Sequence, residues 1–189
     1  WEERDEYFDI NPTGMTPALT DPDKNIKIAD SRAICEYIDE TVEAAPMMNG
    51  PSLYRAEIRR LVAWFDERFF IDVTAPLMQE RLRKRVIYRS PPDATVLREA
   101  MRAANAHLDY IDYLIDTRSW LAGATMSMAD LAAAAQISVA DYLGGIDWNG
   151  HEQTRAWYAM FKSRPSFRPL LSERMGNIPP PPYYEKVDF

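Results

Sequence analysis

Apolar residues recur at the spacing of an α-helix over most of the chain after residue 52. One set occupies a single helical face: Ile58, Leu61, Val62, Phe65 and Phe69. We predict one long helix here, which Pro76 kinks because proline lacks an amide hydrogen. Asp93 is a good N-cap for the next helix, which ends before Arg118. The apolar positions of that second helix have the same spacing: Met101, Leu108, Ile111 and Leu114.

The helix that follows opens on a capping motif. Ser127 and Asp130 have the spacing of a capping box, with aspartate in place of the usual Glu or Gln. Residues 131–139 are apolar nearly all round, which predicts a helix at the centre of its domain. Two more helices are predicted at residues 157–162 and 167–175. This part of the chain is therefore predicted to be all-helical.

The start of the chain follows a different pattern. Residues 16–20 and 26–29 are two short extended segments joined by a loop rich in turn-forming residues. Asp30 and Ser31 are well placed to cap the helix that comes next. Two strands cannot stand alone in water. The small domain must therefore pair its strands with a segment ahead of Trp1, or be incomplete.

These patterns divide the chain into four parts. Residues 1–43 form the small domain with strands, and residues 44–52, with two prolines and a glycine, read as a linker. Residues 53–175 form the helical domain, and residues 176–189 form a proline-rich tail. The expected fold class is α+β, mostly α.

Composition narrows the range of functions. The net charge of -7 is concentrated in residues 1–45, which carry 12 acidic and 4 basic residues. An acidic chain without a basic stripe is a poor nucleic-acid binder, so we expect no nucleic-acid partner. No stretch is long and apolar enough to cross a membrane, so no membrane insertion is expected. The single Cys35 excludes an internal disulfide and favours a reducing cytoplasm.

Few residues suggest chemistry. Cys35 lies on the face of a predicted helix that should pack, which favours an inert core thiol. His107 sits among apolar helical positions and reads as a packed or surface histidine, and His151 lies in a turn with no visible partner. No spacing fits a metal site. The basic run at residues 81–85 reads as a solvated helix face, or else as a docking patch for an acidic partner.

Four motifs in this order resemble the glutathione transferase superfamily. Asn11-Pro-Thr-Gly14 with Thr16-Pro17 is similar to the loop around the family's cis-proline. Asp30-Ser31 is similar to the acid–serine step that opens the third helix of its thioredoxin-like domain. Trp120–Gly123 with Ser127–Asp130, and Trp157-Tyr158 with Lys162–Pro165, resemble parts of its helical domain. The resemblance implies the back half of a thioredoxin-like domain, without its first strand, first helix and second strand, followed by the family's all-helical domain.

The resemblance also implies positions for glutathione. Thr16 and Pro17 match the residues that pair with its cysteinyl part, and Asp30 and Ser31 match the step that holds its γ-glutamyl carboxylate. Both steps also have a purely structural interpretation, as a turn and a helix cap. Met15 stands where many glutathione binders carry a basic or amide side chain, and a thioether cannot hold a carboxylate.

No catalytic residue is assigned. In the family, the side chain that activates the thiol follows the first strand, which is absent from this chain. The resemblance therefore implies lost activity and no cofactor. The alternative is a glutathione-dependent transferase or isomerase, with glutathione held at Thr16, Pro17, Asp30 and Ser31. A third interpretation is a chaperone or redox partner that binds glutathione without turnover.

The tail is unlike the rest of the chain. Four prolines favour a stiff, extended segment with little entropy left to lose. It either folds back on its own domain or serves as a recognition segment. Its candidate partner-binding residues are Tyr183, Tyr184, Glu185, Val187, Asp188 and Phe189.

The resemblance narrows to members of this family that bind FtsZ, the tubulin-like polymer of the bacterial division ring. The stretches that carry it are Trp1–Arg4, Asn11–Met15, Val62–Asp66 and the closing Val187–Phe189. It implies a non-catalytic homodimer in the cytoplasm that is recruited to the division site and regulates FtsZ filaments there through its C-terminal region. Trp64, Phe65, Phe69 and Phe70 add mild support for a dimer, since one helix face cannot bury them all.

Overall fold

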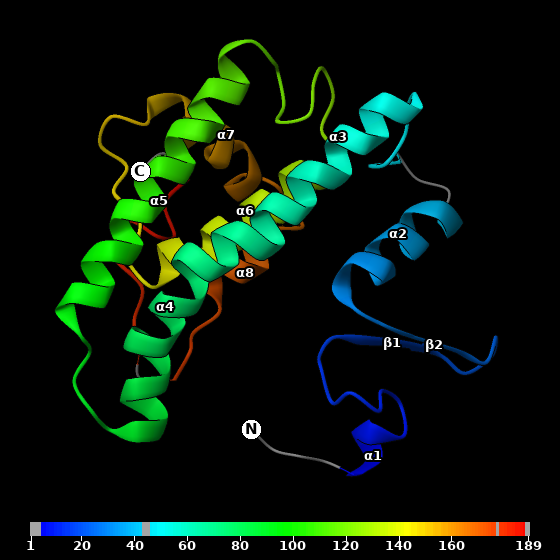
Figure 1. Ribbon diagram of the computed structural model, residues 1–189, viewed down its shortest axis with the longest axis horizontal. Helices are drawn as coiled ribbons and strands as arrows, with labels where there is room; N and C mark the ends of the chain where they lie inside the picture. The colour runs from blue at the N-terminus through cyan, green and yellow to red at the C-terminus, as the bar shows by residue number, and fades with distance from the viewer. Residues whose placement is uncertain (1–4, 43–45, 177, 188–189) are drawn as a thin grey trace. The chain divides into compact units, whose positions relative to one another are not determined.

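The computed structural model describes residues 5–42, 46–176 and 178–187. It divides into two compact units, Trp1–Asn49 and Gly50–Phe189, which are described separately below (Figure 1). The boundary falls inside the predicted linker of residues 44–52. The linker prediction is wrong at its last residue, because Ser52 already begins a helix.

The first unit is a hairpin followed by a helix. It contains α1 (Asp5–Phe8), β1 (Ala18–Asp21), β2 (Ile26–Ala29) and α2 (Ser31–Thr41). The strands are antiparallel, with Ala18 opposite Ala29 and Asp21 opposite Ile26. β1 starts two residues later than predicted, because Pro17 has no amide hydrogen to give to the ladder.

Helix α2 is less buried than the sequence suggested. None of its residues is buried among those described, and Cys35 is only half-buried. The prediction of a core thiol is therefore wrong. A two-stranded hairpin offers too little surface to cover the apolar face of a three-turn helix.

The second unit is built around one long helical segment. It runs through α3 (Ser52–Ala63), η1 (Trp64–Thr74), α4 (Ala75–Leu77) and η2 (Met78–Tyr88), where η1 and η2 have π-helical hydrogen bonding. Figure 1 shows this segment changing direction between α3 and α4, which contains Pro76. Because proline cannot donate to the helical ladder, the predicted kink falls where the backbone bonding is interrupted.

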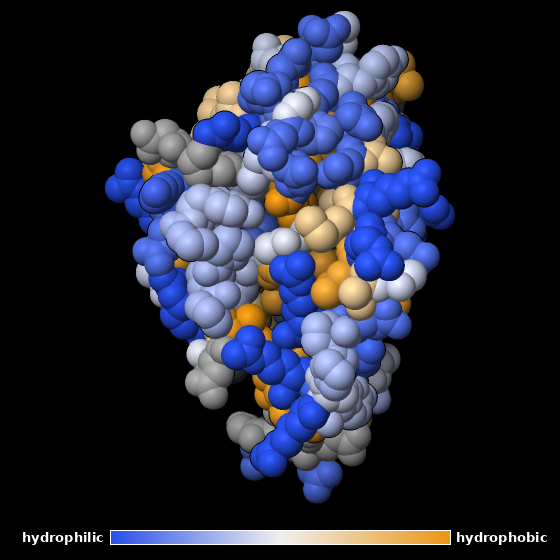
Figure 2. Space-filling model, turned by 90° about the vertical axis from the view of Figure 1, so that its left-hand side faces the viewer, coloured by the Kyte–Doolittle hydropathy of each residue, from blue (hydrophilic) through white to orange (hydrophobic). Residues whose placement is uncertain are grey.

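Four more helices complete this unit: α5 (Ala94–Asp116), α6 (Met128–Tyr142), α7 (Glu152–Lys162) and α8 (Arg168–Ser172). Helix α6 packs against α3 and η1, while α5 packs against η1 and α7. Nine of the fifteen residues of α6 are buried, which agrees with the central position expected for it. Figure 2, viewed from the side on which α5 lies in Figure 1, shows a mostly polar surface with apolar side chains gathered in a central hollow.

The described part of the tail is folded onto the second unit rather than extended. Ile178 and Tyr184 are 6% and 3% exposed. Part of the apolar surface that suggested a recognition segment is therefore already buried within the second unit. Asp188 and Phe189, two of the predicted contact residues, lie outside the described residues, as does Asn177.

Candidate functional site

The loop ahead of β1 is organised by one buried side chain. Asn11, 4% exposed, donates from Nδ2 to the carbonyl of Met15 at 2.6 Å and accepts from the Thr13 amide at 3.2 Å. Tyr7 Oη also donates to the Met15 carbonyl, at 2.7 Å. The Met15 side chain, in contrast, is 70% exposed. The loop is thus held by side chains that bond to its backbone, and the exposed Met15 side chain carries no charge.

The glutathione-site equivalents lie at one end of the hairpin. Thr16 and Pro17, joined by a cis peptide bond, precede Ala18, and Asp30 and Ser31 follow Ala29, the strand partner of Ala18. The strand register therefore brings both steps close together. Among the described residues, no hydrogen bond involves the Thr16 backbone.

Asp30 acts as a helix cap. Its Oδ1 accepts from the amides of Arg32 at 2.8 Å and Ala33 at 3.3 Å, while its own backbone has φ of 79°. Ser31 is the first residue of α2 and is exposed. The carboxylate is engaged by the helix N-terminus, so Ser31 is the side chain of the two that is left to face a ligand.

The two histidines of the second unit are structural. His107 is 5% exposed, and its Nδ1 accepts a hydrogen bond of 3.1 Å from Trp64 Nε1. Its Nε2 lies 3.2 Å from Asp72 Oδ2. This geometry fixes the neutral tautomer with the proton on Nε2, and burial lowers the pKa of His107. The His107 prediction of a packed side chain agrees with this position.

His151 does have a partner, contrary to the expectation from sequence. Its Nδ1 lies 2.8 Å from Asp112 Oδ2. The other oxygen of Asp112 accepts from the amide and the hydroxyl of Thr154 at 2.8 and 2.7 Å. Asp112 on α5 therefore caps the first turn of α7. The partner lies 39 residues away, so no local pattern could have indicated it.

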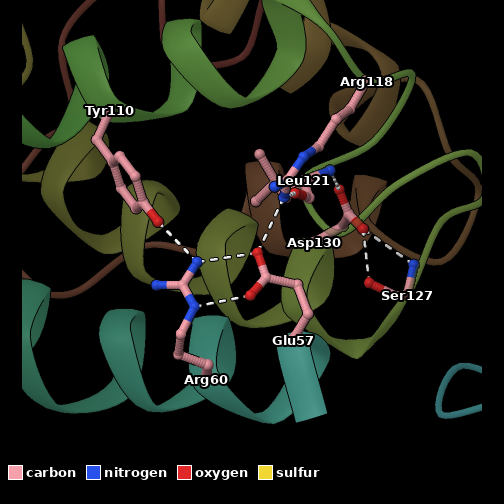
Figure 3. Close-up of polar contacts among 7 residues, drawn as sticks. All are labelled: Glu57, Arg60, Tyr110, Arg118, Leu121, Ser127 and Asp130. Carbon is pink, nitrogen blue, oxygen red and sulfur yellow. Dashed lines mark hydrogen bonds and ion pairs between the residues drawn. The ribbon is translucent and has the colours of Figure 1, made fainter. Parts of the chain in front are cut away.

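A buried carboxylate joins the capping box to two other elements (Figure 3). Asp130, 0% exposed, accepts from the amide of Ser127 at 2.9 Å and from its hydroxyl at 3.0 Å. Its other oxygen accepts from the Leu121 amide at 2.9 Å and from Trp157 Nε1 at 3.2 Å. Burial raises the pKa of Asp130. The residue thus fixes the loop before α6 and helix α7 as well as capping its own helix.

An ion-pair network lies beside it in the same view. Glu57 bridges Arg60, at 2.7 and 2.9 Å, and Arg118, at 3.0 Å (Figure 3). Arg60 also donates to Tyr110 Oη at 2.8 Å. The hydrogen bond from Arg60, together with that from Arg118, lowers the pKa of Glu57 to about 2. These contacts tie α3 to α5 and to the loop that follows α5.

The C-terminal segment, meaning residues 175–176 and 178–187, is anchored by a polar cluster at the end of α6. Tyr142 Oη donates to the Ile178 carbonyl at 2.7 Å and accepts from the Met175 amide at 2.8 Å. The rings of Tyr142 and Tyr184 meet edge to face, with centroids 5.2 Å apart. Lys162 Nζ lies 5.6 Å from the centroid of the Tyr184 ring. The tail is therefore attached both by hydrogen bonds and by ring packing.

Two buried charges lie under this segment. Asp141 and Lys162 are both 0% exposed. Burial raises the pKa of Asp141 to about 6 and lowers that of Lys162 to about 8. Burial also raises the pKa of Tyr183 to about 12, and the nearby negative charge of Asp141 adds to the rise. Tyr184 is thus an anchor within the unit, while Tyr183 is half-buried, and the assignment of both as partner contacts stays a prediction.

The end of the described chain keeps exposed groups. Glu185 pairs with Arg174 but leaves 59% of its side chain exposed, and Lys186 is exposed beside it. Val187 is half-buried. Of the predicted contact residues within the described chain, Glu185 is exposed, Tyr183 and Val187 are half-buried, and Tyr184 is buried.

The described ranges lack two further classes of site. No group of three or more His, Cys, Asp or Glu there is placed to hold a metal ion. None of the helices described is long and apolar enough to cross a membrane.

Comparison with known proteins identifies the family. The N-terminal domain of glutathione S-transferases matches residues 1–41, and their C-terminal domain matches residues 73–165. The chain belongs to the glutathione S-transferase superfamily, with a mostly helical fold and a small two-stranded sheet. The resemblance that the motifs indicated is confirmed.

Its relatives include a protein named for its localisation with FtsZ. FtsZ-localized protein A of Caulobacter vibrioides is 42% identical over 191 residues, which cover 100% of this chain and 84% of the relative. The solved structure of FzlA from C. crescentus has a TM-score of 0.93 at 41% identity, with 100% and 84% of the two chains covered. A glutathione S-transferase from Rhodospirillum rubrum F11 has a TM-score of 0.94 at 46% identity, with the same coverage.

Proposed function

We propose that this protein is a non-catalytic member of its superfamily that binds FtsZ filaments and regulates their organisation during cell division. The observation that carries the proposal is the 42% identity, over the whole chain, with a protein named for its localisation with FtsZ. On this proposal the protein works in the cytoplasm and is recruited to the division site. We interpret β1, β2 and α2 as the second half of a thioredoxin-like domain.

The contact is proposed to lie at the C-terminal end of the second unit. Glu185 and Val187 are accessible there, and Asp188 and Phe189 follow them in the sequence. The half-buried Tyr183 is proposed to take part in the contact, and the buried Tyr184 anchors the segment that carries it. A segment held in place by its own domain loses little conformational entropy on binding, which favours affinity.

We also propose that the protein acts as a homodimer. Of the aromatic residues that suggested a dimer, Phe65 and Phe69 are fully buried, while Phe70 is 40% exposed and the adjacent Ile71 is 64% exposed. A second copy would remove this apolar surface of η1 from water. Two C-terminal ends in one dimer would bind neighbouring filaments together, with an avidity above that of one contact.

Co-sedimentation with assembled FtsZ filaments tests the proposal. We expect the intact protein to pellet with filaments and the Asp188→Lys variant to remain in solution, with Asp116→Lys as a control for the same charge change at an exposed acid on α5. A chain cut after Asn177 should also fail to pellet. Because the cut removes the buried Tyr184, its circular dichroism must be compared with that of the intact protein. Absence of intact protein from the filament pellet would refute the proposal.

One observation favours a second candidate, a glutathione-dependent transferase or isomerase. The unbonded Thr16 backbone, the cis Thr16-Pro17 bond and the exposed Ser31 lie at the same end of the hairpin. A helix N-terminus favours a carboxylate at such a place. Retention on glutathione resin that is lost in a Pro17→Ala variant would support this candidate, and conjugation assays on the retained protein would separate turnover from binding alone.

A further inference from the structure

The second unit contains a cavity of about 420 Å³ that the functions proposed above do not use. It lies between η2, the loop before α5, the end of α6 and the C-terminal segment. Arg81, Arg85 and Glu80 contribute from η2, Tyr142 and Leu143 from the end of α6, and residues 179–181 from the proline run. Cavities of this size are typical of ligand-binding sites in proteins.

The cavity carries uncompensated positive charge. Glu80, 5% exposed, is balanced by Lys84 Nζ at 2.6 Å and also accepts from the Asp93 amide at 2.6 Å. Arg81 and Arg85 have no acidic partner within 4.0 Å among the described residues. Two arginines therefore line the cavity without an acidic partner from the described chain.

Arg81 is held in position by the backbone. It is half-buried, and its guanidinium donates to the Leu143 carbonyl. Gly144, with φ of +66°, leaves room for it, since a Cβ at this position would come within 2.7 Å of Arg81 Nη1. Burial lowers the pKa of Arg81. A positive charge that is taken partly out of water without an anion is costly, and an incoming anion would offset that cost.

The apolar residues that line the cavity limit the kind of anion that fits. Tyr142, Leu143 and three successive prolines add apolar surface to the same lining. Arg81 and Arg85 both line the cavity from η2, so together they can hold two neighbouring acidic groups. An inorganic anion would fill little of the volume and leave the apolar wall wet. A short peptide that carries both acidic and aliphatic side chains matches both features.

We propose that this cavity is a docking site for an acidic peptide segment, whose carboxylates bind Arg81 and Arg85 and whose aliphatic side chains pack on the proline wall. The basic run of residues 81–85 then has a divided role. Arg81 and Arg85 bind the peptide, Lys84 neutralises Glu80, and Arg83, which is exposed and does not line the cavity, remains on the solvated face. The site does not depend on FtsZ as the partner.

Fluorescence anisotropy with a labelled peptide of alternating aspartate and leucine tests the site. Arg85→Glu should weaken binding about tenfold or more, because it replaces a charge-assisted contact with repulsion. Arg83→Glu makes the same charge change on the same helix and should leave binding within about twofold. Arg85 and Arg83 are both exposed, so neither variant threatens the fold. Gly144→Ala, which displaces Arg81, should also weaken binding while circular dichroism stays unchanged.

Three results would overturn the proposal. The native protein could fail to bind the probe at millimolar concentration, or Arg83→Glu could weaken binding as much as Arg85→Glu, which would mean non-specific attraction. Alternatively, inorganic phosphate could displace the peptide at equal concentration, which would mean a small-anion site. A matching peptide with asparagine for aspartate must bind more weakly. Because the probe contains no FtsZ, a failure of the peptide to bind would not bear on the filament co-sedimentation assay.

Discussion

Tyr142→Phe should loosen the C-terminal segment without unfolding the second unit. The change removes only the hydroxyl, which donates to the Ile178 carbonyl and accepts from the Met175 amide. The ring keeps its edge-to-face contact with Tyr184. The effect therefore reports the two hydrogen bonds alone.

The expected cost follows from how buried each partner is. Ile178 is 6% exposed, so its unpaired carbonyl costs about 1–3 kcal/mol. Met175 is 36% exposed, so its amide regains water and adds less than about 1 kcal/mol. Together the loss is about 2 kcal/mol, which corresponds to a rise of roughly 30-fold in the population with the segment detached.

Trypsin digestion measures this population directly. The Arg174–Met175 bond lies at the amide that Tyr142 holds, and cleavage follows the open population when opening is faster than cleavage. We expect cleavage after Arg174 to accelerate about 30-fold, while cleavage after Lys24, in the hairpin turn of the first unit, is unchanged. Tyr113→Phe, at a residue 70% exposed, serves as the control. Acceleration below about threefold, or equal acceleration at both bonds, would refute the reasoning.

Three further predictions concern the helical unit and the dimer. Asp130→Asn should destabilise the unit by about 2–4 kcal/mol in urea denaturation. Each carboxylate oxygen of Asp130 accepts from an N–H donor, and in the variant one of these donors meets an amide nitrogen instead. The control, Asp93→Asn, should change the stability little because asparagine caps a helix equally well. Equal effects of the two changes would contradict this. Because the pKa of Glu57 is lowered from 4.5 to about 2, its contribution to folding stability is present above pH 4.5 and is lost as the pH falls towards 2. The urea midpoint of Glu57→Gln should therefore vary less with pH over this range than the midpoint of the native protein. Parallel pH dependences of the two midpoints would exclude the effect. Ile71→Glu should lower the mass measured by light scattering from that of two chains to that of one. A native protein with the mass of one chain would refute the dimer proposal.

Local signals in the sequence located much of the helical unit. The aspartate at position 93 predicted the start of α5, and its side chain accepts from the Thr95 and Val96 amides. The apolar run after Asp130 predicted a central helix, and α6 occupies that place. These predictions succeeded because caps and helical periodicity depend on residues only a few positions apart.

Long-range partners could not be predicted in the same way. Helix α7 begins at Glu152 rather than at residue 157, because Asp112 on α5 caps its first turn. The tail reads as extended from its prolines, yet Tyr142 and Lys162 provide a surface that buries Tyr184. In both cases the deciding contact joins residues more than twenty positions apart, which composition and periodicity do not encode.

The distribution of polar groups favours binding over chemistry in the second unit. His107, His151 and Asp130 are the buried groups most suited to acid–base work, and each is bonded to side chains or backbone of other elements that it fixes in place. A general base needs a bond it can release to a substrate. Arg85 and Glu185, in contrast, keep exposed charge, Arg85 at the cavity that residues 179–181 also line and Glu185 near the end of the described chain. Exposed charges beside a segment whose position Tyr142 fixes are what a surface that presents contacts to a partner requires.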